Sequence, residues 1–371
     1  MEWTLTDQEK KLFPLKTISS IVALFRSILR RSTDPDLTFL SIICGCIENT
    51  LTCNSAHHQL AATARSAAIA EEPEALAAGE GTRNVQIVTV QACSSGDEGD
   101  FPEVELDVVM ALRAKFAAIL CSAVDSRPGD SLLTREIIKK VSDVIWNTLT
   151  RSYYKDRAHL QSIYSYLTGS RIVIRHLTRF LEIFFCHPGN KLDCFGVAVA
   201  VVAGCQILGL RGVHLALSED HVWVIFGPEN ETVEVTWHGK GNEDKRGQAV
   251  DPKVSHHSWL YVGGKPVVCS RYTEVAALVS SINPSISATT DSLEVASLQQ
   301  SLLWLLNDGD HLAKYPMALG NLADLEELNR TPGRVHCSRI LDEAIDVARR
   351  HYDNRHVYPY TYQAGYFYRN R

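Results

Sequence analysis

The sequence predicts a mainly α-helical protein with one small α/β unit near its middle. Apolar residues recur at helical spacing over most of the chain outside that unit. Two short alternating runs, 222–226 and 232–237, are separated by a Gly-Pro-Glu-Asn turn and should pair as a β-hairpin. With 371 residues, of which 45% are hydrophobic, the chain is long enough for two or three packed units.

Residues 8–60 are predicted to form two helices. The second helix, 36–52, is almost wholly apolar, and we expect both helices in the core. Residues 54–103 differ, because they are rich in Ala, Glu and Gly and contain one β-like run at 85–90; we expect one strand and a poorly ordered arm there. The apolar stripe of the first helix comprises Leu15, Ile18, Ile21, Val22, Leu24, Phe25, Ile28 and Leu29.

The middle of the chain is predicted to contain three helices and three strands. Helices are expected at 104–125, at 134–168 with Thr134 as the N-cap, and at 195–210. The hairpin strands follow, and a third strand is expected at 258–268.

Beyond residue 270 the sequence again has helical periodicity. Ala344 and Ala348 stand one helical turn apart in a predicted helix over 338–352. The run Ala364-Gly365-x-x-Tyr368 resembles part of a tetratricopeptide repeat. We therefore expect a stack of helical repeats in this part of the chain.

Charge and cysteine content exclude several classes of protein. The chain has 37 Lys and Arg against 43 Asp and Glu, a net charge of −6, and no long basic run, so any contact with DNA is expected to be indirect. Most of the ten cysteines lie in apolar helical surroundings, which is typical of reduced intracellular thiols. The spacing of Cys44 and Cys46 is not that of a metal site, and no metal or cofactor is expected. No signal peptide or membrane span is expected.

Several long blocks of the sequence are specific enough to identify a family. They are LFPL at 12–15, KKVSDVIWNTLTRSYYKDRAH at 139–159, LALSEDHVW at 215–223, EVTWHGKGNED at 234–244, SINPS at 281–285, TDSLE at 290–294 and YPMALGNLADLEEL at 315–328. Through these blocks the chain resembles the menin family, nuclear scaffolds of trithorax-type histone methyltransferase complexes, over roughly residues 8–371.

The resemblance implies three domains. They are an N-terminal helical domain at 1–125, a transglutaminase-like domain at 126–268, and a helical-repeat domain that begins at 269. We expect the chain to stop inside this stack, without the later repeats and the basic tail of the family. Residues 170–190 are inserted relative to the family, and either a lineage-specific packing helix or a gene-model artefact such as translated intron accounts for them.

The resemblance also implies an acidic and aromatic pocket that binds short basic peptides with apolar anchors. Asp156, Glu219 and Asp220 would attract Arg or Lys of the peptide, while Leu217, Met317 and the tyrosines would form the walls. The full expected set is Asp156, Leu217, Ser218, Glu219, Asp220, His221, Val222, Ser280, Tyr315, Met317, Tyr362 and Tyr366. The chain departs from the family at Ala277 and Ser280, where the family has Phe and Cys.

His221, at the entrance of a strand, occupies the place of the base in transglutaminase-like and papain-like enzymes. Such catalysis needs a thiolate at a helix N-terminus, a histidine and a group that orients the imidazole. Phe195 stands at the nucleophile's place, where the family has Ser, and Cys194 is one residue out of register; we expect Cys194 to be a buried structural thiol pointing away from His221. Thr236 stands where the orienting carboxylate is needed, so no catalysis is expected.

The partners implied by the resemblance are the N-terminal peptide of a mixed-lineage-leukaemia-type histone methyltransferase, JunD-like transcription factors and the lens-epithelium-derived growth factor, in the nucleus. Two other classes stay open. One is a thiol-dependent transglutaminase- or peptidase-like enzyme using Cys194 and His221, and the other is a generic helical-repeat adaptor.

Overall fold

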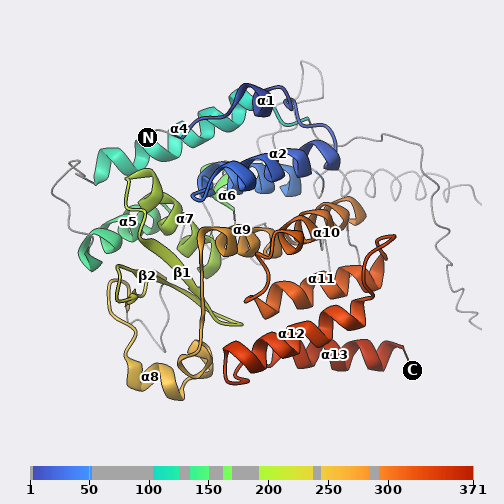
Figure 1. Ribbon diagram of the computed structural model, residues 1–371. Coiled ribbons are helices and arrows are strands. Elements are labelled where there is room, and N and C mark those ends of the chain that lie inside the picture. Colours follow the sequence, from blue (N-terminus) through green and yellow to red (C-terminus); the bar gives the residue numbers. More distant parts are fainter. Residues whose placement is uncertain are drawn as a thin grey trace, which may run out of the picture.

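A computed structural model describes residues 3–49, 51, 103–124, 134–149, 162–168, 192–236, 244–284 and 292–370. Over these residues the protein is mainly helical with one small antiparallel sheet, as Figure 1 shows. The predicted strand at 85–90, nearly all of the arm at 54–103 and the insertion at 170–190 lie outside the described residues.

The N-terminal helices are α1 (Asp7–Lys10), α2 (Ile18–Arg31), a helix over 37–49, and α4 (Leu106–Ala123). Helix α2 begins after Thr17, whose hydroxyl accepts a hydrogen bond from Ser20 N at 3.1 Å, so one of the free N–H groups of the first turn is satisfied. The predicted apolar stripe is confirmed for α2, because Ile21, Leu24, Phe25, Ile28 and Leu29 are all buried. Leu15 is buried ahead of the helix and pairs with Val104.

Two helices of the middle region, α5 (Arg135–Thr148) and α7 (Cys194–Ile207), pack against the sheet, whereas α6 (Ile163–Thr168) packs against α4. Residues 150–161 of the helix predicted at 134–168 are not described. Thr134 caps α5 as predicted, accepting from Ile137 N at 3.4 Å. Helix α7 is apolar on every side because it is packed between α5 and the strands (Figure 1).

The sheet has the strand order β3-β2-β1-β4, with β1 (Val213–Leu217), β2 (Val222–Phe226), β3 (Glu231–Val233) and β4 (Val267–Val268). The predicted hairpin is confirmed in β2 and β3, which pair from Val224↔Val233 to Phe226↔Glu231. Strand β1 was not predicted; it pairs with β2 through the turn formed by Ser218–His221.

The strand predicted at 258–268 is wrong over most of its length. Residues Pro252–His257 form α8, and Trp259–Gly264 form the 3-10 helix η1. Gly263 and Gly264 have φ values of 60° and 79°, and the left-handed backbone there is incompatible with a continuous strand. Only β4 remains extended and pairs with β1.

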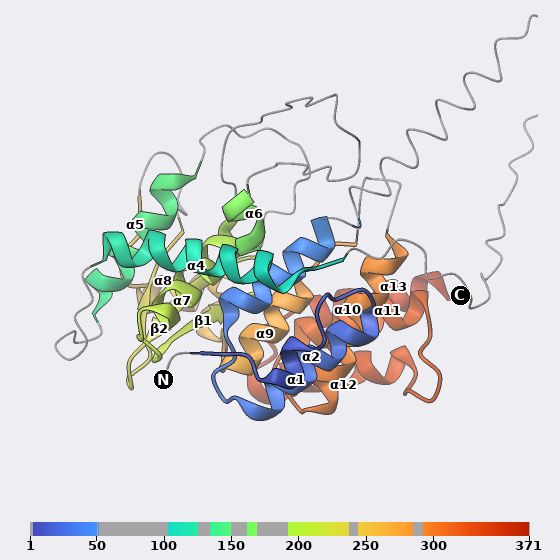
Figure 2. The ribbon, with the colours of Figure 1, turned by 90° about the horizontal axis from the view of Figure 1, so that it is seen from above.

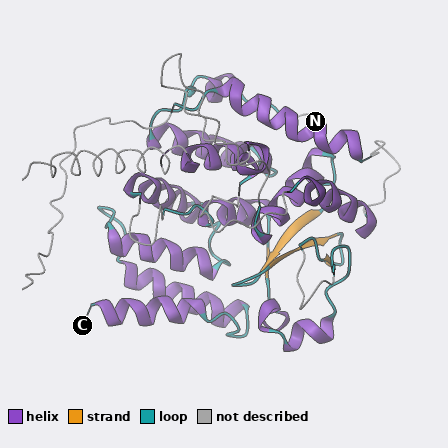
Figure 3. Ribbon diagram, turned by 180° about the vertical axis from the view of Figure 1, so that it is seen from behind, coloured by secondary structure: helices purple, strands orange, loops and turns teal. Residues whose placement is uncertain are grey.

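The C-terminal third is a stack of helices, α9 (Arg271–Ser280), α10 (Leu293–Asp308), α11 (Pro316–Leu328), α12 (Cys337–His351) and α13 (Tyr358–Arg369). Figures 1 and 3 show α10 to α13 lying in successive layers, with α13 outermost. Ala344 and Ala348 are buried on α12, as expected for a close helix contact. Helix α10 also packs against α2, which joins this stack to the N-terminal helices (Figure 2).

Within the ranges given above, no helix combines the length and apolar character that a membrane crossing needs. The same residues hold no cluster of three or more His, Cys, Asp or Glu side chains in a metal-binding arrangement.

Candidate peptide-binding site

A cavity of about 530 Å³ lies between the β1–β2 turn, the first turn of α7, the end of α9 and helices α11 and α13. Every described residue of the expected set except Tyr366 lines this cavity. Segments far apart in the sequence therefore converge on one hollow. Asp156 lies outside the described residues.

Tyr366 stands one helical turn after Tyr362 on α13, yet only Tyr362 reaches the cavity. The Tyr362 ring lies over Gly320 of α11; a Cβ at Gly320 would come within 2.4 Å of the ring. The Tyr366 ring packs instead at the start of α12, with its centroid 6.2 Å from that of His336. Helical spacing put both phenols on one face, but the packing of α12 directs the second away from the cavity.

The wall of the cavity is acidic. Asp193, Glu219, Asp220 and Asp324 all line it, and no Lys or Arg is found among its described lining residues. Asp324 and the neighbouring Asn321 were missed in the sequence, although a signal was present. Met317, Asn321 and Asp324 follow one another at intervals of four and three residues, which places them on one face of α11.

Glu219 and Asp220 hold α13 in place as well as facing the cavity. The Glu219 carboxylate accepts from the backbone N–H of Tyr358 at 2.6 Å, at the N-terminus of α13 where a negative charge is favoured. Asp220 accepts from the Tyr358 hydroxyl at 2.6 Å and from Trp259 Nε1 at 3.0 Å. The second carboxylate oxygen of Glu219 is buried without a hydrogen-bond partner. These two acids therefore have a structural role, and both also line the cavity.

Two carboxyl groups of the cavity, Glu219 and Asp324, have raised pKa values. Burial raises the pKa of Glu219, against the lowering effect of the N–H groups at the start of α13. Burial also raises the pKa of Asp324 to about 6, although Arg369 opposes this with its guanidinium 3.4 Å away. Both groups lack full solvation, and a cation entering the cavity would favour their ionised forms.

The expectation that His221 lacks an orienting carboxylate is wrong. His221 is buried, and its Nε2 lies 3.1 Å from the carboxylate of Glu234, which also accepts from the Tyr261 hydroxyl at 2.6 Å. Residues two apart in an extended segment share a face, so Glu234 lies on the same face as Thr236. Glu234 supplies the carboxylate that orients the His221 imidazole, which threonine lacks. The His221 ring also stacks on Trp223, with centroids 5.9 Å apart. These contacts fix the position of the His221 side chain in the wall of the cavity.

The expected burial of Cys194 is also wrong, because this residue is exposed and lines the cavity. Surrounding protein atoms and the adjacent Asp193 carboxylate raise the pKa of the thiol, which therefore stays protonated near neutral pH. Phe195, the next residue, also lines the cavity. The structure brings a histidine, a carboxylate and a thiol to one region, but the thiol is poorly activated.

We expect iodoacetamide to modify Cys194 at pH 7 no faster than Cys121, another exposed cysteine, because the raised pKa leaves little thiolate. Peptide mapping by mass spectrometry gives the two rates. The variant His221→Gln, which keeps a polar side chain against Glu234, should leave the Cys194 rate unchanged. Rapid modification that slows in this variant would restore the thiol-enzyme interpretation.

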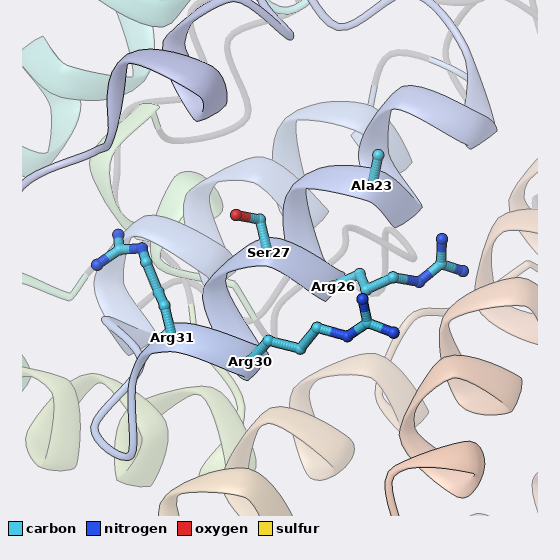
Figure 4. Close-up of a pocket in the computed structure, with 5 residues that line it drawn as sticks. All are labelled: Ala23, Arg26, Ser27, Arg30 and Arg31. Atoms are coloured by element: carbon cyan, nitrogen blue, oxygen red, sulfur yellow. The ribbon is translucent and has the colours of Figure 1, made fainter.

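A second hollow, of about 410 Å³, lies along α2 and is lined by Ala23, Arg26, Ser27, Arg30 and Arg31. Figure 4 shows that Arg26 and Arg30 project together, whereas Arg31 extends away from them. Arg31 is paired with buried Glu9 at 2.7 Å, and Ser27 donates to the same carboxylate at 2.9 Å. This hollow is basic, but all of its described lining residues lie on the single helix α2.

Comparisons with known proteins agree with this architecture. The sequence profile of the Menin family matches residues 6–178 and 171–371. A crystal structure of menin that reveals the binding site for the Mixed Lineage Leukemia (MLL) protein is 43% identical in sequence, with a TM-score of 0.75. The match covers 96% of this chain and 67% of that menin chain. The two matching segments of the profile together span nearly all of the sequence, so the chain belongs to the menin family.

Proposed function

We propose that this chain is a non-enzymatic, menin-like scaffold whose cavity binds a short basic peptide. The observation that carries the proposal is the lining of the cavity, whose described residues include four carboxylates and no Lys or Arg. The structurally similar menin has a binding site for the MLL protein. A peptide of that methyltransferase class is therefore the partner that we propose.

Apolar anchors of the peptide would supply most of the binding energy. Tyr315 is buried and Tyr362 is partly buried, and with Met317 they give the cavity apolar surface on the side of the helical stack, beside the polar Asn321 and Asp324. Burial of an aromatic or aliphatic anchor there removes apolar surface from water, while the carboxylates select cationic neighbours and speed association. The apolar and acidic parts of the cavity thus favour a peptide that contains both apolar and basic residues.

Membership of the menin family supports further proposals about the domains, Asp156 and additional partners. Residues 126–268 would be a transglutaminase-like domain without activity, and residues from 269 the start of a tetratricopeptide-like stack after the helical domain at 1–125. Asp156 would add a further carboxylate for the peptide. JunD-like transcription factors and the lens-epithelium-derived growth factor are proposed as further partners, in the nucleus, where the scaffold would regulate transcription and histone H3 lysine methylation.

The direct test is calorimetric titration with a synthetic peptide from the N-terminus of a mixed-lineage-leukaemia-type methyltransferase that contains arginine. A peptide with citrulline at each arginine is the matched control, since it keeps the shape and removes the charge. We expect saturable binding that weakens as salt rises and is much weaker for the citrulline peptide. Equal binding of both peptides, or none by a folded protein, would refute the function.

Asp324→Asn is expected to weaken binding of the arginine peptide about tenfold, or roughly 1.4 kcal/mol, because it removes a poorly solvated charge from the wall. With a pKa of about 6, Asp324 is ionised at pH 7 and neutral at pH 5, so affinity should fall as pH decreases through 6. Titrations at both pH values test this, with Asp308→Asn, outside the cavity, as the control.

The raised pKa of Asp324 also predicts whether its removal stabilises or destabilises the folded protein. A carboxyl whose pKa is higher in the folded state binds a proton on folding, so the ionised form disfavours the fold at pH 7. Asp324→Asn should therefore raise the free energy of unfolding at pH 7 while it weakens binding. A loss of stability together with unaltered binding would instead identify Asp324 as a structural residue.

A further inference from the structure

Two oxygen atoms at the end of α9 and on α10 have no hydrogen-bond partner although they are buried beside the cavity. They are the Ser280 hydroxyl and the Gln299 side-chain carbonyl, and both residues line the cavity. A buried polar group without a partner destabilises the folded protein by about 1–3 kcal/mol. Such groups at a cavity wall indicate a binding function, because a ligand that supplies the missing partner removes this penalty.

The orientation of the Gln299 amide follows from its contacts. Gln299 is 1% exposed, and its nitrogen donates to the carbonyl groups of Val279, Ser280 and Ile282 at 3.0, 3.1 and 2.7 Å. Three acceptors around one atom require that atom to be the nitrogen rather than the oxygen. The unpartnered atom is therefore the carbonyl oxygen, which accepts and cannot donate.

Asn321 of α11 completes a group of neutral polar side chains. Its amide nitrogen donates to the Ser280 carbonyl at 3.2 Å, which places it beside the same turn of α9. A primary amide carries two N–H groups, so Asn321 has a second donor to offer. Ala277, one helical turn before Ser280, also lines the cavity and leaves room above the group. We call Ala277, Ser280, Gln299 and Asn321 the amide pouch.

We propose that the amide pouch receives a primary carboxamide side chain, asparagine or glutamine, of the bound peptide. Its NH₂ group would donate to the Gln299 carbonyl and the Ser280 hydroxyl, and its oxygen would accept from Asn321. This inference rests on the proposed peptide-binding function and adds a specificity that the acidic wall does not provide.

A neutral amide fits the pouch better than a charged group. A carboxylate would be repelled by Glu219 and Asp324 of the same cavity and could not donate to the Gln299 oxygen. An ammonium would be desolvated among neutral groups and would leave the free donor of Asn321 unmatched. Asp324 lies three residues after Asn321 on α11, so the amide would sit about one helical turn from the site of the peptide cation.

Ala277 and Ser280 both line the cavity and suit such an occupant. The Ala277 side chain is small, and the Ser280 hydroxyl can accept a hydrogen bond from an amide. An apolar anchor would fill the space but would leave both oxygens without partners.

The test uses four small probes, N-acetyl dipeptide N-methylamides that combine arginine or norleucine with glutamine or methionine. Norleucine removes the charge of arginine without adding a carboxamide, and methionine has nearly the shape of glutamine and cannot donate. Chemical-shift titrations with the whole protein give the dissociation constants. We expect glutamine to bind at least about fivefold more tightly than methionine, with either arginine or norleucine, because a site with unmatched polar groups discriminates against a ligand that lacks the donor.

Two serine variants locate the effect. Ser280→Ala should reduce the glutamine preference to about twofold or less and leave the melting temperature unchanged or higher, since it removes an unpartnered hydroxyl. Ser281→Ala is the matched control. The Ser281 hydroxyl already donates to the Leu278 carbonyl at 2.8 Å, so this variant should keep the full glutamine preference.

The outcomes separate this inference from the proposed function. Equal binding of the glutamine and methionine probes would mean that a trapped water, and not a ligand, serves the two oxygens, and would overturn the inference even if arginine still bound better than norleucine. Equal binding of the arginine and norleucine probes, together with a preserved glutamine preference, would overturn the basic-peptide function and leave the pouch. Loss of the preference in Ser281→Ala but not in Ser280→Ala would also overturn the inference.

Discussion

Arg271→Ala is expected to lower the free energy of unfolding by about 3–5 kcal/mol, because it leaves a buried carboxylate without its cation. Arg271 is 4% exposed, and its guanidinium lies 2.6 Å from Glu274 and 2.9 Å from Asp34. It also donates to the backbone carbonyl groups of Val213 and Arg211. The side chain thereby joins α9 to β1 and to the loop that follows α2.

Glu274 makes the loss of Arg271 severe. Glu274 has no exposed surface and also accepts from the backbone N–H of Leu215 at 2.9 Å, so it cannot turn toward water without breaking β1 away from α9. Urea denaturation followed by circular dichroism measures the change. Arg211→Ala is the control; its side chain is 62% exposed and 3.4 Å from Asp34, and its loss should change stability by less than about 1 kcal/mol. Similar small effects of both variants would show that the buried network contributes little.

Glu326→Ala is the second large expected effect, a loss of about 3 kcal/mol or more in the free energy of unfolding, because several buried donors lose their common acceptor. Glu326 is 3% exposed on α11. Its carboxylate accepts from Gln300 Nε2 and Trp304 Nε1 at 2.5 Å each and from the backbone N–H of Thr331 at 2.9 Å. These contacts join α10, α11 and the loop that follows α11.

The pH dependence of this network has the opposite sign to that of Asp324. Burial opposes ionisation of Glu326, but the hydrogen bonds from Thr331, Trp304 and Gln300 outweigh it and lower the pKa of the carboxyl. The stabilisation is therefore present above the pKa of the unfolded state and is lost as pH falls through the lower folded value. Denaturation at pH 7 and at pH 3 should show a smaller difference between wild type and Glu326→Ala at the acidic pH.

Glu327→Ala is the matched control for Glu326, one residue later on the same helix. Glu327 pairs with Arg369, and the Arg369 side chain is 53% exposed while that of Glu327 is 18% exposed. Because solvent screens this pair, removal of Glu327 should change stability by about 1 kcal/mol at most. Since α11 also carries Met317, Asn321 and Asp324, a destabilised Glu326 variant should bind peptide normally once it is folded. Comparable destabilisation by both variants would contradict the role given to the buried network.

Local sequence patterns were sufficient for the helices and for one hairpin. The spacing of Ile21, Leu24, Phe25 and Ile28 predicted the buried face of α2, and alternation predicted β2. Strand β1 and the helical turns at 252–264 were missed. The whole of β1 is five residues of mostly buried chain, which lacks the alternation of a half-exposed strand. The 3-10 helix at 259–264 depends on left-handed backbone at Val262, Gly263 and Gly264, which periodicity does not record.

The sequence by itself determined the family, the helical class and ten of the 22 described residues that line the cavity, because long identical blocks and apolar spacing are properties of neighbouring residues. Only the tertiary structure decided how those residues work. Glu219 meets the start of α13 across 139 residues, Glu234 rather than Thr236 orients His221, and Tyr366 turns away from Tyr362. The partnerless oxygens of Ser280 and Gln299 are likewise visible only when every neighbouring donor is placed. Hydrogen bonding and burial depend on contacts between distant segments, and spacing along one segment does not specify those contacts.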